Sequence, residues 1–244
     1  MDPTQLGMNR TGIQMSPLTS NALIEAALET EPTSEGDAQS LLQLREPYLL
    51  EADPVGSVPI PGTLTGAARA GVKLMQGERL HALIDRLGER LAFERGGVRL
   101  YEALIGKCET RTDEAVEIDV AVLRRFRDDE AEHFRLVSAA MEELGGDPTA
   151  QTPCADVSGV AAMGLMQVAL DPRTSVLQTL HAVLGAELID GADWELLVQL
   201  TRDQGYDDIA ERFARAAQEE AVHLEQIHEW YATASANSMR RSVQ

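Results

Sequence analysis

Residues 123–144 read LRRFRDDEAEHFRLVSAAMEEL and place a glutamate and a histidine in the middle of an otherwise apolar helical stripe. At alternating three- and four-residue spacing, the stripe consists of Leu123, Phe126, Glu130, His133, Val137, Ala140 and Leu144. This spacing is typical of a helix that buries one face in a bundle. Glu130 and His133 should therefore lie on the buried face, where an unpaired carboxylate is strongly destabilising.

Three further segments repeat this pattern. One stripe contains Glu220 and His223, a second contains Glu187, and a third, less regular stripe contains Glu94. We expect four long helices, at Glu78–Lys107, Ala115–Leu144, Ser175–Thr201 and Tyr206–Thr233. Lys and Arg are nearly absent from the stripes, so divalent cations rather than salt bridges should compensate the buried carboxylates.

The spacing along the chain also indicates that these acids lie level with one another. The midpoint between Glu94 and Glu130 is residue 112, and the midpoint between Glu187 and Glu220 lies between residues 203 and 204. Both midpoints fall in polar, turn-like sequence. In two antiparallel hairpins, residues equally far from the turn lie at the same depth.

The Glu-x-x-His spacing alone does not select the site, because four of the five histidines follow a glutamate by three. Glu78 and His81 begin about 24 Å along the helix from Glu94, at 1.5 Å per residue. Glu225 and His228 flank a core position. We interpret both pairs as surface pairs, and His181, which is off its stripe, as a packed or capping residue.

The ends of the chain and the long internal connection differ from these segments. Residues 1–65 contain seven of the ten prolines and read as an N-terminal extension, followed by a bundle at 66–236 and a tail at 237–244. The short elements that we expect are helices at Asn21–Glu29, Asp37–Arg45 and Val157–Leu170, the last within the connection Gly145–Arg173, and an extended run at Pro54–Pro61.

Bulk composition limits the partners and the compartment. A formal charge of −19 argues against nucleic acid or anionic membrane as a partner. Cys108 and Cys154 are too few for a disulfide framework or a thiolate cluster. The start of the chain lacks a signal-peptide pattern, and the apolar stretch Gly159–Leu170 is short for a membrane span. We expect a soluble, cytoplasmic protein.

The order Glu94, Glu130-x-x-His133, Glu187, Glu220-x-x-His223 resembles that of the ferritin-like superfamily of di-iron and di-manganese carboxylate proteins. In this superfamily two helices each contribute one Glu and the other two each contribute Glu-x-x-His. The resemblance covers residues 78–232. It implies an all-α four-helix bundle with a long crossover between its second and third helices, and a site for two Fe ions, or Mn, held by these six residues.

The resemblance also implies roles for four neighbouring residues. Asp129 and Glu219, each directly before a paired motif, should accept hydrogen bonds from the outer nitrogen of a ligand histidine on the facing helix. Tyr101 follows Glu94 by seven and matches a tyrosine near the metals in ferritins, so it could act in catalysis or simply fill the core. Asp190 follows Glu187 by three, as a second carboxylate does in rubrerythrins, with an outer-ligand role or a surface position both open.

The implied activity is that of an oxidoreductase in which Fe(II) reacts with O₂ or H₂O₂. The alternatives are a rubrerythrin-like peroxidase, which would need an external reductant because the chain lacks a four-cysteine iron site, a manganese catalase, an oxygenase acting on a small organic substrate, and non-enzymatic iron storage or structural metal binding. We also expect a homodimer or a larger homo-oligomer.

Overall fold

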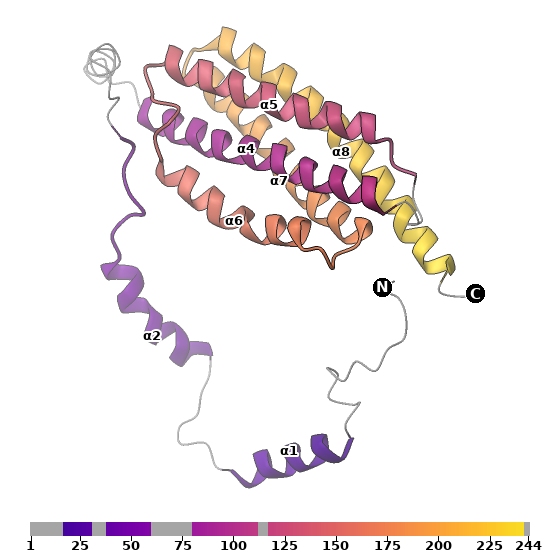
Figure 1. Ribbon diagram of the computed structural model, residues 1–244. Helices are drawn as coiled ribbons and strands as arrows, with labels where there is room; N and C mark the ends of the chain where they lie inside the picture. Colours follow the sequence, from indigo (N-terminus) through magenta and orange to yellow (C-terminus); the bar gives the residue numbers. More distant parts are fainter. Residues whose placement is uncertain (1–16, 31–37, 60–79, 112–116, 242–244) are drawn as a thin grey trace. The chain divides into compact units, whose positions relative to one another are not determined.

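The computed structural model describes residues 17–30, 38–59, 80–111 and 117–241, and these ranges contain helices and no strand (Figure 1). The expected all-α class is therefore confirmed. The helices are α1 (Pro17–Glu29), α2 (Ala38–Glu51), α4 (Leu80–Thr110), α5 (Val120–Glu143), α6 (Pro153–Leu170), α7 (Val176–Asp203) and α8 (Asp207–Arg241).

The chain divides into two compact units, residues 1–54 and 55–244. The expected boundary between residues 65 and 66 lies outside the described residues. In the first unit, the expectation that α2 ends near Arg45 is wrong, because α2 continues through Pro47 to Glu51. Proline deprives the Gln43 carbonyl of its helical partner. The residues of α2 are exposed, so water can hydrogen-bond that carbonyl instead.

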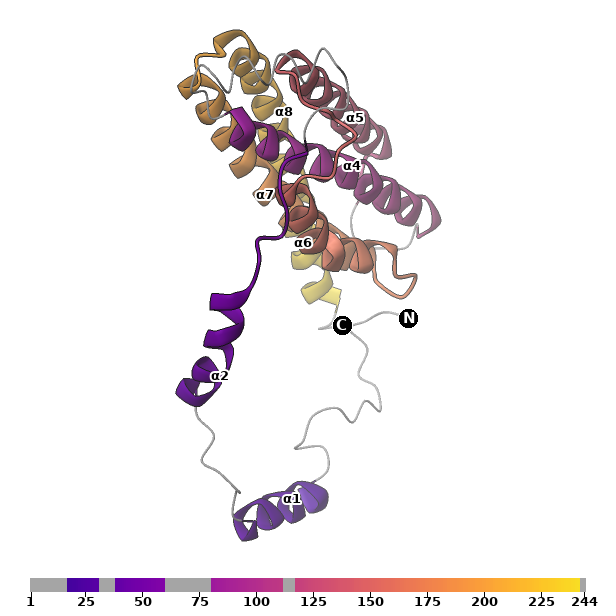
Figure 2. The ribbon, with the colours of Figure 1, turned by 90° about the vertical axis from the view of Figure 1, so that its left-hand side faces the viewer.

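In the second unit, α4 packs against α5, α6 and α7, and α8 packs against α7 and α5 (Figures 1 and 2). Two apolar clusters fill the interior. One includes Leu104, Phe126 and Ile227, and the other includes Leu87 and Phe213. In α4, α5, α7 and α8 the buried polar residues lie between the members of one cluster and the members of the other. The fold thus encloses a polar layer between two dry, apolar regions.

Local signals define where these helices begin and end. The Asp119 side chain caps α5, and Ser175 forms a capping box with Gln178 at the start of α7. Gly145 and Gly205 follow α5 and α7 with φ of 89° and 79°. Each is accompanied by the two backbone hydrogen bonds of a Schellman motif, which need a residue in this left-handed region.

Helix α6 begins earlier than expected, because Thr152 caps it and Pro153 occupies its first turn. Its 18 residues are long and apolar enough to cross a membrane by length and composition alone, so the apolar stretch as a whole is longer than the sequence suggested. Three of its residues, Ala155, Ser158 and Ala169, are buried, and the helix packs along α4 and α7. The cytoplasmic location stays a prediction.

Candidate metal centre

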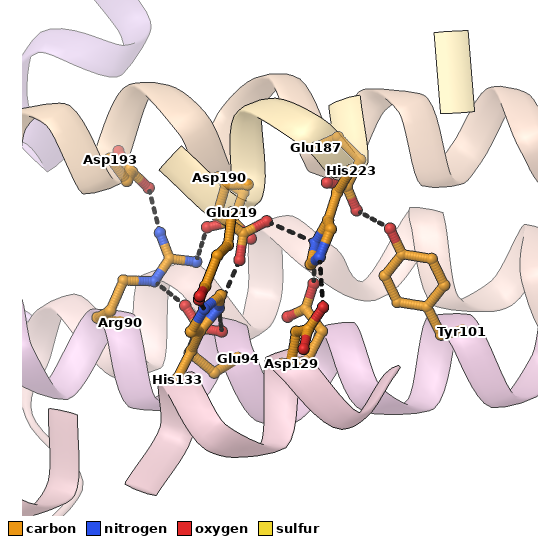
Figure 3. A network of polar contacts seen from close by, with 12 residues as sticks. Arg90, Glu94, Tyr101, Asp129, His133, Glu187, Asp190, Asp193, Glu219 and His223 are labelled. Carbon is orange, nitrogen blue, oxygen red and sulfur yellow. Dashed lines mark hydrogen bonds and ion pairs between the residues drawn. The ribbon is translucent and has the colours of Figure 1, made fainter. Parts of the chain in front are cut away.

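The six candidate ligands lie together in the polar layer, and each is between 0 and 3% exposed (Figure 3). Helices α4 and α7 each contribute one glutamate, and α5 and α8 each contribute a glutamate and a histidine one helical turn apart. The residues are Glu94, Glu130, His133, Glu187, Glu220 and His223.

Their ligand atoms form two overlapping groups in which all atoms lie within 4.8 Å of one another. We name them position A and position B. Position A consists of Glu130, Glu187, Glu220 and His223, and position B consists of Glu94, His133 and Glu220. Glu220 belongs to both, because its two oxygens lie 2.6 Å from Nδ1 of His133 and 3.0 Å from Nδ1 of His223.

Each histidine is held from outside by an acid on the facing helix. Nε2 of His133 donates to Glu219 at 2.8 Å, and Nε2 of His223 donates to Asp129 at 3.2 Å. These are the contacts expected from the sequence. A carboxylate accepts only, so each ring has its proton on Nε2 and directs the lone pair of Nδ1 inward.

Tyr101 also contacts the cluster. Its hydroxyl donates to Oε1 of Glu187 at 2.7 Å, and its ring lies edge-on to His223 and Phe126. Burial, together with the negative charge of Glu187, raises the pKa of the Tyr101 phenol well above its usual value. Tyr101 is therefore a neutral hydrogen-bond donor at the position A end.

Arg90 corrects the expectation that salt bridges play no part. Its side chain is 2% exposed, and Nε lies 2.7 Å from Oε1 of Glu94, one helical turn away. Nη2 lies 2.7 Å from Oδ1 of Asp190, and Nη1 lies 3.9 Å from the half-exposed Asp193 (Figure 3). The apolar stripe of α4 was too irregular to reveal that Arg90 shares a face with Glu94.

Asp190 is buried, at 1% exposed, so a surface position is ruled out. One of its oxygens lies within 4.8 Å of oxygens of Glu94, Glu130 and Glu220. Asp190 is thus close enough to the ligands to approach a metal, while its other contact is the ion pair with Arg90.

The acids and imidazoles of the layer shift one another's protonation. Burial raises the pKa of Glu187 to about 8, with the charge of Glu220 adding to the shift. Burial opposes the charged form of His133, but its contacts with Glu220 and Glu94 outweigh this and raise its pKa to about 9. Burial likewise opposes ionised Glu220, but the two histidines lower its pKa to about 2. Glu220 is therefore the acid most firmly ionised at neutral pH.

Gly97 makes room for a ligand, which the sequence did not suggest. A Cβ atom at this position in α4 would lie 2.6 Å from the carboxyl carbon of Glu130, closer than real contacts allow. At the adjacent Gly96 a Cβ atom would have nothing within 4 Å. The signal in the sequence was a glycine pair inside a helix, three residues after Glu94.

The remaining histidines lie outside the cluster. His81 and His228 are exposed, in agreement with their interpretation as surface residues, while Glu78 lies outside the described residues. His181 is also exposed, and its ring stacks on Tyr231 with 5.3 Å between centroids.

A divalent cation fits this donor set. Oε2 of Glu130 and Oε2 of Glu187 are buried and have no hydrogen-bond partner among the described protein atoms. Carboxylate oxygens that point into a dry interior need a proton or a cation. No family profile matches the chain, and no curated protein or solved structure matches it either. The centre is therefore interpreted from its own chemistry.

Proposed function

We propose that this chain is a ferritin-like carboxylate oxidoreductase with two iron ions, in which Fe(II) reacts with O₂ or H₂O₂. One observation carries the proposal: four helices direct four glutamates and two histidines into one buried layer, and an outer acid orients each histidine. In this proposal α4, α5, α7 and α8 are the helices of a ferritin-like bundle, and the connection that contains α6 is its crossover.

The charge of the layer supports two divalent ions. The layer contains five buried carboxyls, from the four ligand glutamates and Asp190, and one permanent cation, Arg90. With neutral histidines as ligands, the charges sum to −5 + 1 = −4, which two divalent ions cancel. Oxygen donors with one imidazole per metal favour Fe or Mn over metals that prefer thiolates.

The surrounding residues would control the chemistry that iron supplies, which is the transfer of electrons to a small oxidant. Glu220, firmly ionised, would bridge positions A and B. Protons held on Glu187 and on Nδ1 of His133 would leave as metals bind. The two apolar clusters exclude water from either side of the layer. Tyr101 would keep Glu187 oriented by its hydrogen bond.

The space beside the layer favours a small oxidant over an organic substrate. A pocket that adjoins Arg90, between α4 and α7, has a volume of about 10 Å³, room for about one water molecule. A larger pocket of about 710 Å³ lies at the end of α6, and none of the six ligands lines it.

Metal analysis of anaerobically purified protein, followed by stopped-flow spectroscopy, tests the proposal. We expect two Fe per chain and oxidation within seconds of adding O₂. Faster oxidation by H₂O₂, with cycling sustained by an external reductant, would indicate a peroxidase. Bound Mn with disproportionation of peroxide would indicate a catalase, and hundreds of Fe in a shell-sized particle would indicate storage. Protein that binds no divalent metal would contradict the proposal.

A further inference from the structure

The two ends of the metal centre differ in the charge of one hydrogen-bond donor. At the position A end, Tyr101 donates to Oε1 of Glu187 at 2.7 Å. At the position B end, Arg90 donates to Oε1 of Glu94, also at 2.7 Å. The geometry is similar, but the phenol is neutral and the guanidinium is a cation. A charge-assisted hydrogen bond is roughly twice as strong as a neutral one.

Arg90 is held firmly in this place. Its guanidinium lies 4.5 Å from the centroid of the Phe93 ring and 5.5 Å from that of Trp194, and the ion pair with Asp190 fixes a second edge. Arginine keeps its proton in proteins, so no change of pH in the ordinary range releases Glu94. Only Oε2 of Glu94 is left to face His133, whose Nδ1 lies 3.8 Å away.

Position B also has fewer donors. Four residues converge at position A and three at position B, and Glu220 is shared. A ligand whose charge is partly neutralised by a guanidinium donates less to a metal. At position B this loss falls on one of two glutamates, whereas the three glutamates of position A have no cationic partner.

We propose that Arg90 is a positioning residue that restricts Glu94 to a single-oxygen ligand and thereby makes position B the weaker metal position. Position A fills first, and the ion at position B binds second and exchanges. This inference rests on the proposed metal centre and adds to it the order of loading and the residue that sets that order.

The experiment titrates the full chain, treated with a chelator, with Mn²⁺ at equilibrium. EPR separates isolated Mn²⁺ from a coupled pair. Wild-type protein should show a tight and a weak step, His223→Asn should remove the tight step, and His133→Asn should remove the weak one. Equilibrium affinities are needed because a shorter side chain at residue 90 also opens the adjoining pocket and would speed loading.

Arg90→Gln replaces the cation with a neutral donor, as at the Tyr101 end, and should tighten position B about 10-fold while leaving position A unchanged. Arg90→Lys keeps the charge and is the matched control, with position B still weak. A role confined to packing would weaken both positions together, and that result would overturn the inference.

The double variant Arg90→Gln/Asp190→Asn keeps the net charge of the layer, and position B should still bind more tightly than in the wild type. A return to wild-type affinity would mean that net charge alone acts, which contradicts the restriction of Glu94. Two equal steps in the wild-type protein would also overturn the inference while leaving the metal centre intact. Protein without any Mn²⁺ step would instead overturn the proposed function.

Discussion

The two ends of the centre have similar ligands but different neighbours. Each end has a histidine that an outer acid orients and a terminal glutamate that receives a hydrogen bond from a buried donor. Tyr101 follows Glu94 by seven residues and contacts the position A end. Trp194 follows Glu187 by seven and lies 5.5 Å, ring to ring, from His133 at the other end. The repeated motif thus builds two similar sites, and residues outside the motif make them different.

Removing the shared ligand should abolish the comparison altogether. Glu220→Ala takes away the one carboxylate that both positions use and leaves both histidines without their inner partner. We expect less than one metal per chain by elemental analysis, against two in the wild type. The exposed Glu225→Ala, one helical turn further along α8, should keep both metals. Full occupancy of the Glu220→Ala variant would refute the assignment.

Filling the space at Gly97 should damage position A. Gly97→Ala forces the Glu130 carboxylate away from its present place, so affinity at position A should fall by at least about 100-fold, comparable with the loss of a charged contact. Gly96→Ala is the matched control. Its methyl group meets nothing, and alanine should stabilise the helix by up to about 1 kcal/mol. Equal metal affinity in the two variants would show that Glu130 is not held by this close approach.

The outer acids allow each end to be weakened separately. Glu219→Gln should lower affinity at position B and Asp129→Asn at position A, each by about 10- to 100-fold, because each removes the charged acceptor that fixes one imidazole. The Mn²⁺ titration with EPR reports both steps. If each variant weakened both steps equally, the acids would act on the whole layer rather than on one histidine.

The pH dependence of stability should be modest and should change sign with metal. The pKa of Glu187, about 8, and of His133, about 9, lie above the usual values of these groups, so the folded chain binds more protons than the unfolded chain. The free energy of unfolding of chelated protein should therefore fall as pH rises from 6 to 9. A decrease in Tm of at least about 3 °C is expected, since about 1 kcal/mol shifts Tm by about 2–4 °C at this size.

Metal reverses the sign because the same protons must leave before it binds. The increase in Tm on adding Mn²⁺ should be larger at pH 8.5 than at pH 6. An increase in Tm that is independent of pH would show that these groups are not displaced by the metal.

The helices and the six candidate ligands were predictable because their signals are local. The periods of three and four residues mark the buried faces, and equal distances from two turns bring the acids level. Helix ends were less certain. The helix expected to end at Thr233 continues to Arg241, because no glycine or proline interrupts the sequence up to that point.

By itself the sequence determined the all-α class, the four long helices and which acids face inward, since each follows from the order of residues along one helix. Only the tertiary structure decided what those acids meet. Arg90 reaches Asp190 on another helix, Gly97 leaves space for Glu130, and Tyr101 contacts Glu187 rather than a residue of its own helix. These contacts depend on how two helices are rotated and spaced against each other, and the packing of the whole core sets that geometry.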